Sequence, residues 1–115
     1  MIDEQRDLMV VCPVYNDSAS ALFALAEEWE KALDARGASW EWVFIDDGST
    51  APGTRQALRE IAADRPRFKV WRTPNQGRDR AALFGREMVR GLTRRVLQVD
   101  SDSPPAREAY SASRR

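Results

Sequence analysis

The chain of 115 residues contains no histidine, one cysteine and only two lysines among its 18 basic residues. Without histidine, it lacks the side chain that most often serves as general base or metal ligand near neutral pH. The lone cysteine, Cys12, excludes a disulfide within the chain, and its place in the apolar stretch LMVVC indicates a small buried residue. Any chemistry would therefore depend on carboxylates, arginines and backbone amides.

Long apolar runs are also missing. No stretch approaches the roughly 18 apolar residues that a membrane-spanning helix needs. The first residues, MIDEQRD, are too polar for a signal peptide. We therefore expect a cytoplasmic protein, with peripheral attachment at the inner membrane face as an alternative. The length is that of one domain.

The net charge is zero, but the two signs are unevenly distributed along the chain. Residues 1–50 carry 11 acidic and 3 basic residues, a net charge of −8. Residues 51–115 carry 7 acidic and 15 basic residues, a net charge of +8. Such a chain could hold an anion in its basic part and a cation among its acids, although solvated surface charges are the simpler alternative. We expect no nucleic acid among its partners.

The hydrophobic pattern alternates between strand and helix. Short apolar runs predict buried strands at 8–12, 40–45, 68–72 and 95–99. Between these runs, apolar residues recur at helical spacing: Leu22, Leu25, Ala26, Trp29 and Leu33; then Leu58, Ile61 and Ala62; then Ala81, Phe84, Gly85, Met88, Val89 and Leu92. Asp17 or Ser18 could cap the first helix, and Gly37 could end it. Strands separated by helices predict a parallel sheet with right-handed crossovers, hence an α/β fold.

Polar clusters follow three of the predicted strands: PVYND after the first, DDGS after the second and DSD after the fourth. In an open parallel sheet, ligands bind outside the carboxyl ends of the strands. Acidic residues far apart in the chain would then meet at one edge. Because strand-end loops are usually polar, any one cluster alone would mean little.

Asp100 and Asp102 are two residues apart, so on an extended chain they point to the same side. Two carboxylates held close together repel one another unless a cation or proton lies between them. Their hard oxygen atoms suit Mg²⁺ or Mn²⁺. The alternative is a solvated turn that happens to contain two acids.

Asp46 and Asp47 end the second predicted strand, and Gly48 permits a tight turn after them. Carboxylates there could accept hydrogen bonds from ribose hydroxyls or from the N–H of a base. Helix capping or an Asx turn by Asp47 and Ser49 is an equally good interpretation.

Gly77 opens the third predicted helix, with Arg78 and Arg80 in its first turn. Arginine at a helix N-terminus opposes the helix dipole, and a bound anion would relieve that cost. The alternative is a solvent-facing arginine, which is common in a chain with 16 of them.

Together these stretches resemble the family 2 glycosyltransferases, enzymes of the GT-A fold that use nucleotide-diphosphate sugars. VVCPVYND is similar to the family's opening strand and P-x-Y-N-E motif, and WVFIDDGST to its D-D-G-S motif. NQGRDRAALFGREMVRG follows its N-x-G-x-x-x-A-x-x-x-G pattern, and VLQVDSD resembles its D-x-D motif. The stretches ALFG and LQVDSD are closer to the branch that contains dolichol-phosphate mannose synthase.

The resemblance implies a three-layer α/β/α fold with a mostly parallel sheet ordered 3-2-1-4, a truncated GT-A fold. Residues 1–103 would form the nucleotide-sugar-binding domain, and residues 104–115 a loosely ordered tail. The implied nucleotide-binding residues are Pro13, Tyr15, Asn16, Asp17, Asp46, Asp47, Gly77, Arg78, Arg80 and Asp100. Asp100 and Asp102 would be the residues at the Mg²⁺ or Mn²⁺.

The chain departs from the family pattern in three places. Asp17 stands where the family usually has Glu, and the stretch between Gly91 and Asp100 is slightly long, which could shift the register of the last strand. Family members also continue well past the D-x-D motif, where they supply the acceptor site and, in inverting enzymes, a catalytic base. We therefore expect an incomplete enzyme with no identifiable catalytic base.

The expected partners are a UDP- or GDP-sugar and, as acceptor, a polyprenyl phosphate or a glycan. The fourth strand, exposed at the sheet edge, could also mediate self-association. Two alternatives to a glycosyltransferase remain open. One is a nucleotide-binding module without turnover, or a fragment that needs a partner. The other is a flavodoxin-like signalling or scaffold domain.

Overall fold

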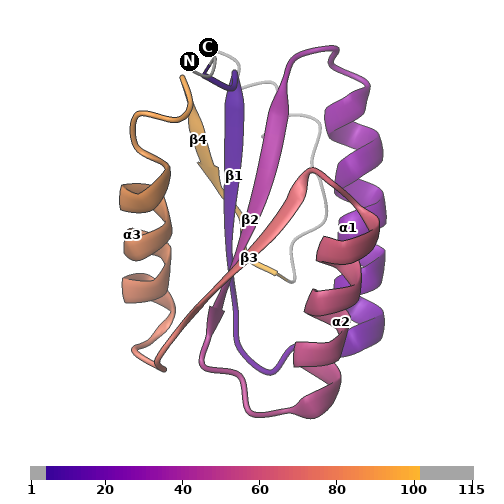
Figure 1. Cartoon of the computed structure of the whole chain (residues 1–115), viewed down its shortest axis with the longest axis vertical. Coiled ribbons are helices and arrows are strands. Elements are labelled where there is room, and N and C mark those ends of the chain that lie inside the picture. Colours follow the sequence, from indigo (N-terminus) through magenta and orange to yellow (C-terminus); the bar gives the residue numbers. More distant parts are fainter. Residues whose placement is uncertain (1–4, 102–115) are drawn as a thin grey trace.

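The computed structural model describes residues 5–101, so Asp102 and the expected tail lie outside the described residues. Four strands alternate with three helices along this part of the chain (Figure 1). In order, the elements are β1 (Leu8–Val14), α1 (Ala19–Asp34), β2 (Trp40–Asp47), α2 (Pro52–Asp64), β3 (Phe68–Thr73), α3 (Arg78–Val89) and β4 (Val96–Gln98). The predicted order of strands and helices is confirmed.

The four described strands form one parallel sheet in the order β3-β2-β1-β4, as predicted. In β1, Val10 pairs with Trp42 of β2 on one side and with Leu97 of β4 on the other. β4 is shorter than the predicted strand 95–99 by one residue at each end, although Val99 still donates its backbone N–H to Val11. β4 lies at an edge of the described sheet, and self-association through it stays a prediction.

Both faces of the sheet are covered, which gives the predicted three layers. α1 and α2 lie against one face and α3 against the other (Figure 1). β1 is buried along its whole length because alternate residues point into opposite layers. Leu8, Val10, Cys12 and Val14 join the core under α1 and α2, while Met9 and Val11 join the core under α3. The thiol of Cys12 is thus buried in this core.

The core under α1 and α2 is rich in aromatic rings. Trp42 lies at its centre, with ring centroids 5.4 Å from Trp29 and 5.6 Å from both Phe44 and Phe68. These contacts join α1, β2 and β3, so they fix the helix layer against the strands that carry the site.

α3 ends earlier than its apolar stripe predicts. Ala81, Gly85 and Val89 are one helical turn apart and face the sheet, whereas Met88 is rotated away from them and is 46% exposed. Leu92 lies beyond the helix end and is 52% exposed. Met88 therefore lies in the helix, as its spacing predicted, but the inclusion of Leu92 in the helix was wrong.

Gly85 explains how closely α3 approaches the sheet. A Cβ atom at this position would lie 2.5 Å from Val11 Cγ1 and 2.9 Å from Ile45 Cγ1. Only glycine therefore permits the observed helix–sheet distance.

Within residues 5–101, no helix is both long enough and apolar enough to cross a membrane.

Candidate functional site

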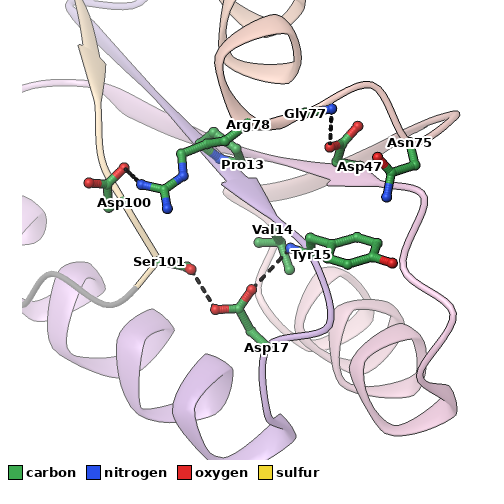
Figure 2. Close-up of a pocket in the computed structure, with 10 residues that line it drawn as sticks. All are labelled: Pro13, Val14, Tyr15, Asp17, Asp47, Asn75, Gly77, Arg78, Asp100 and Ser101. Carbon is green, nitrogen blue, oxygen red and sulfur yellow. Dashed lines mark hydrogen bonds and ion pairs between the residues drawn. The ribbon is translucent and has the colours of Figure 1, made fainter.

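A cavity of about 470 Å³ opens at the carboxyl edge of the sheet, a size typical of small-molecule sites. Its lining residues come from the end of β1 and the loop after it, the end of β2, the loop between β3 and α3, the start of α3 and the segment after β4 (Figure 2). They are Pro13, Val14, Tyr15, Asp17, Asp47, Asn75, Gly77, Arg78, Asp100 and Ser101. The acids that follow three different strands do meet at one edge.

Asp17 lies between the loop after β1 and the segment after β4. One carboxylate oxygen accepts from the backbone N–H of Tyr15 at 3.0 Å, and the other accepts from the Ser101 hydroxyl at 2.5 Å (Figure 2). The cap of α1 is Ser18, whose hydroxyl accepts from the N–H of Ala21. Asp17 is therefore a cavity residue that ties two strand ends together.

Asn16 has a structural role. Its backbone φ of 56° turns the chain after β1. The side-chain oxygen of Asn16 accepts hydrogen bonds from the backbone N–H groups of Thr50 and Ala51, both at 2.9 Å. The backbone N–H of Asn16 donates to the Ser49 hydroxyl. Asn16 thus joins the loops after β1 and β2, and it is not among the residues that line the cavity.

Asp46 and Asp47 are neighbours with different surroundings. Asp46 is buried and accepts from Arg72 Nη1 of β3 at 2.7 Å and from the N–H of Ser49 at 2.9 Å. It does not line the cavity. Asp47 is equally buried, but it borders the cavity and accepts from the backbone N–H groups of Gln76 and Gly77. The Asp46 carboxylate therefore binds β3 and the loop after β2, whereas the Asp47 carboxylate binds the loop between β3 and α3.

The side chains of Arg78 and Asp100 point toward one another at the cavity (Figure 2). Arg78 Nη1 lies 3.4 Å from Asp100 Oδ1, with both side chains substantially exposed. Arg80, in the same helical turn, is exposed and lies outside the cavity lining. The first turn of α3 therefore contributes one of its two arginines to the cavity.

The cavity includes three residues that sequence reasoning did not assign to the site: Val14, Asn75 and Ser101. Two of them had a visible signal. Asn75 opens the N-x-G pattern, and Ser101 stands between the two acids of DSD. Val14 had none, because an apolar residue in a strand is expected in any core.

Of the two acids predicted at the metal ion, Asp100 is the one that the structure describes. Among residues 5–101, no three acidic or cysteine side chains form a group that could enclose a metal ion. Mg²⁺ and Mn²⁺ do not require such a group, because one or two carboxylates, water and substrate phosphates suffice. The Asp100 carboxylate, 44% exposed at the cavity, is a suitable hard oxygen donor. The residues present therefore fit a divalent cation, although the second acid, Asp102, lies outside the described residues.

The parallel order 3-2-1-4, with helices on both faces and polar strand ends, defines a GT-A-like α/β fold. Residues 9–111 match the model of a protein family described as "Glycosyl transferase family 2". The chain belongs to the family 2 glycosyltransferases, and the flavodoxin-like alternative is set aside.

Two similar curated proteins are named as polyprenyl-phosphate sugar transferases. An undecaprenyl-phosphate 4-deoxy-4-formamido-L-arabinose transferase of Pectobacterium carotovorum is 33% identical over 107 residues, which are 91% of this chain and 32% of the relative. A dolichyl-phosphate beta-glucosyltransferase of Saccharomyces cerevisiae is 30% identical over 94 residues, 77% of this chain and 28% of the relative. The chain thus spans about a third of the length of these relatives.

A solved structure shares the fold. It is a mannosyltransferase from Pyrobaculum calidifontis in complex with GDP-Man and Mn²⁺. The TM-score is 0.70 at 25% identity, and the match covers 94% of this chain and 31% of that one.

Proposed function

We propose that this chain is the donor-binding part of a family 2 glycosyltransferase and that its cavity takes the nucleoside diphosphate of a nucleotide sugar. This proposal is supported by the position of four charged side chains, which line one cavity although they come from four separate segments of the chain: Asp17, Asp47, Arg78 and Asp100. A cavity with both a cationic and an anionic side chain suits a phosphate group accompanied by a metal ion.

Each side chain has a distinct task in this proposal. The Arg78 guanidinium donates hydrogen bonds to phosphate oxygens, and the half-exposed ring of Tyr15 borders the nucleoside. Asp100, together with Asp102, holds Mg²⁺ or Mn²⁺. The metal, when bound, would neutralise negative charge on the departing nucleoside diphosphate. The solved mannosyltransferase, which binds GDP-Man and Mn²⁺, supports both the ligand class and the cation.

The acceptor is proposed to be a polyprenyl phosphate, with a glycan as the alternative. The names of the two lipid-phosphate transferases favour the first choice. Because polyprenyl phosphates reside in membranes, the protein would then work at the cytoplasmic surface of a membrane.

Calorimetric titration of the chain with GDP and UDP, each with and without Mn²⁺, tests the proposal. We expect binding of one nucleotide that strengthens with Mn²⁺ and weakens in Asp100→Asn. Asp64→Asn is the matched control, since it removes the same charge from an exposed site at the end of α2. The absence of heat with both nucleotides would refute the proposal, as would equal effects of the two variants.

A further inference from the structure

The carboxylate of Asp47 is already occupied by the loop between β3 and α3. Asp47 Oδ1 accepts from the N–H of Gln76 at 2.9 Å, and Oδ2 accepts from the N–H of Gly77 at 3.0 Å. Oδ1 also accepts from the Thr73 hydroxyl at 3.3 Å. Asp47 is 3% exposed, and hydrogen bonds to a buried charged acceptor are among the stronger ones in proteins.

The adjacent residue, Gly48, lets the same loop approach closely because it has no side chain. Its φ of +74° is one that side chains rarely adopt, and a Cβ here would lie 2.7 Å from the backbone nitrogen of Asn75. Two independent features at the end of β2, a charge and a missing side chain, therefore hold residues 74–77 in place.

This loop leads directly into α3. The N-cap of α3 is Gly77, which has no side chain to satisfy the first N–H groups of the helix. Asp47 supplies a carboxylate to the N–H of Gly77 from a different strand, and a negative charge is favourable at a helix N-terminus. The first helical residue after this contact is Arg78, whose guanidinium pairs with Asp100 in the cavity lining (Figure 2).

We propose that Asp47 is a positioning residue that fixes the start of α3, and that it influences ligand binding through Arg78 and not through a contact with the nucleoside. The second half of this statement rests on the proposed function, because it assigns Arg78 to the phosphates. The first half concerns the free protein alone.

The free protein gives the first test. In Asp47→Asn, one acceptor oxygen is replaced by an amide NH₂ group, so at least one of the two backbone hydrogen bonds is lost. Amide hydrogen exchange at Gln76 and Gly77 should accelerate by about tenfold, the change expected from losing one such bond. Asp64→Asn should leave both amides unchanged. Unchanged exchange at Gln76 and Gly77 in Asp47→Asn would overturn the proposal, whether or not any nucleotide binds.

Ligand binding gives the second test, with GDP and guanosine as probes and UDP and uridine in parallel. Asp47→Asn should weaken diphosphate binding by about tenfold, as expected for a misplaced charged hydrogen-bond donor. It should leave binding of the matching nucleoside within about twofold. In an Arg78→Gln background, it should cause no further loss of diphosphate affinity. Additive losses, or an equal loss for the nucleoside, would mean a direct contact and would overturn the proposal.

Gly48→Ala provides a second route to the same displacement, because it pushes the loop without altering the carboxylate. Thermal melts of all variants verify that the chains compared are folded. If Gly48→Ala moved the amides of Gln76 and Gly77 but left diphosphate affinity unchanged, the link from the loop to Arg78 would be wrong. If the unaltered chain bound neither nucleotide, the proposed function and the second half of this proposal would both fail, and hydrogen exchange at Gln76 and Gly77 would still decide the first half.

Discussion

Arg78 Nη1 lies 3.4 Å from Asp100 Oδ1, so the first residue of α3 and the acid after β4 form an ion pair in the cavity lining. The side chains are 66% and 44% exposed, and ion pairs with this much solvent contribute little to stability. The pair instead sets up a competition. While Asp100 is paired with Arg78, its carboxylate is less available to coordinate a metal ion. In the same way, the paired guanidinium of Arg78 is less available to donate hydrogen bonds to a phosphate.

We expect Arg78→Gln to change metal and nucleotide affinity in opposite directions. Removal of the guanidinium frees Asp100 and takes away a nearby positive charge, so Mn²⁺ should bind the nucleotide-free chain several-fold more tightly. Nucleoside diphosphate should bind about tenfold more weakly, because one charged hydrogen-bond donor is lost. Titration of Mn²⁺ by electron paramagnetic resonance and of GDP by calorimetry would measure the two effects.

Arg59→Gln is the matched control for this experiment, because it removes an exposed arginine from α2, away from the cavity. It should leave both affinities close to those of the unaltered chain. A fall in Mn²⁺ affinity in Arg78→Gln would contradict the competition between Arg78 and Asp100.

Arg72→Ala should destabilise the fold, because it leaves the buried carboxylate of Asp46 without its cationic partner. A buried group that loses its partner costs about 1–3 kcal/mol, and the hydrogen bond from Ser49 to Asp46 would remain. Urea denaturation would measure the change in the free energy of unfolding.

Asp46→Asn isolates the ionic part of that effect. In the Asp46→Asn background, Arg72→Ala should cost much less, since no buried charge is left alone. Equal costs of Arg72→Ala in the two backgrounds would show that Arg72 acts through its packing or through its second bond, to the backbone oxygen of Ser49.

Much of the fold could be predicted from the sequence because its signals are local. The continuous apolar runs, the helical stripes and the polar strand ends all lie within short segments, and the rule that ligands bind at the carboxyl edge brought them together. The structure has a cavity at this edge, and seven of the predicted site residues line it: Pro13, Tyr15, Asp17, Asp47, Gly77, Arg78 and Asp100. Their binding roles stay predictions.

The site residues placed outside the cavity have distant partners that the sequence does not reveal. Asp46 is held by Arg72 on the neighbouring strand, 26 positions away, and Asn16 by backbone N–H groups more than 30 positions away. Adjacent strand residues also face opposite sides, so Asp46 and Asp47 should not be read as one functional unit. The boundary of α3 was harder still, because Met88 and Leu92 are apolar without being buried.

Gly85→Ala should destabilise the protein because the added methyl group would overlap Val11 and Ile45. Overpacking of this kind typically costs about 1–3 kcal/mol. Gly53→Ala is the matched control in α2, where an added Cβ meets nothing within 4 Å. That change should be neutral or stabilising by up to about 1 kcal/mol. Urea denaturation of both variants would test the pair, and equal stabilities would contradict the close packing of α3.

We expect the purified 115-residue chain to bind its sugar donor without catalysing steady sugar transfer. Each described carboxylate in the cavity already has a partner: Asp17 has Ser101, Asp47 has the loop amides, and Asp100 has Arg78. The structure therefore marks none of them as a general base, which typically contributes about 10²- to 10⁴-fold to a rate. The alignments also leave about two-thirds of each relative unmatched, and an acceptor must be held in place for proximity to supply its roughly 7–11 kcal/mol.

A radiolabelled nucleotide-sugar assay, with polyprenyl phosphate or simple sugars as acceptors, would measure transfer with and without Mn²⁺. The same preparation must first bind nucleotide by calorimetry, so that inactivity cannot be attributed to misfolding. Binding without product would agree with a donor-binding part that requires further chain or a partner for catalysis. Steady, metal-dependent product that disappears in Asp100→Asn would contradict this expectation. It would also place the catalytic base among these 115 residues. Asp17 is the first candidate, because within residues 5–101 its carboxylate accepts hydrogen bonds from only the Ser101 hydroxyl and one backbone amide.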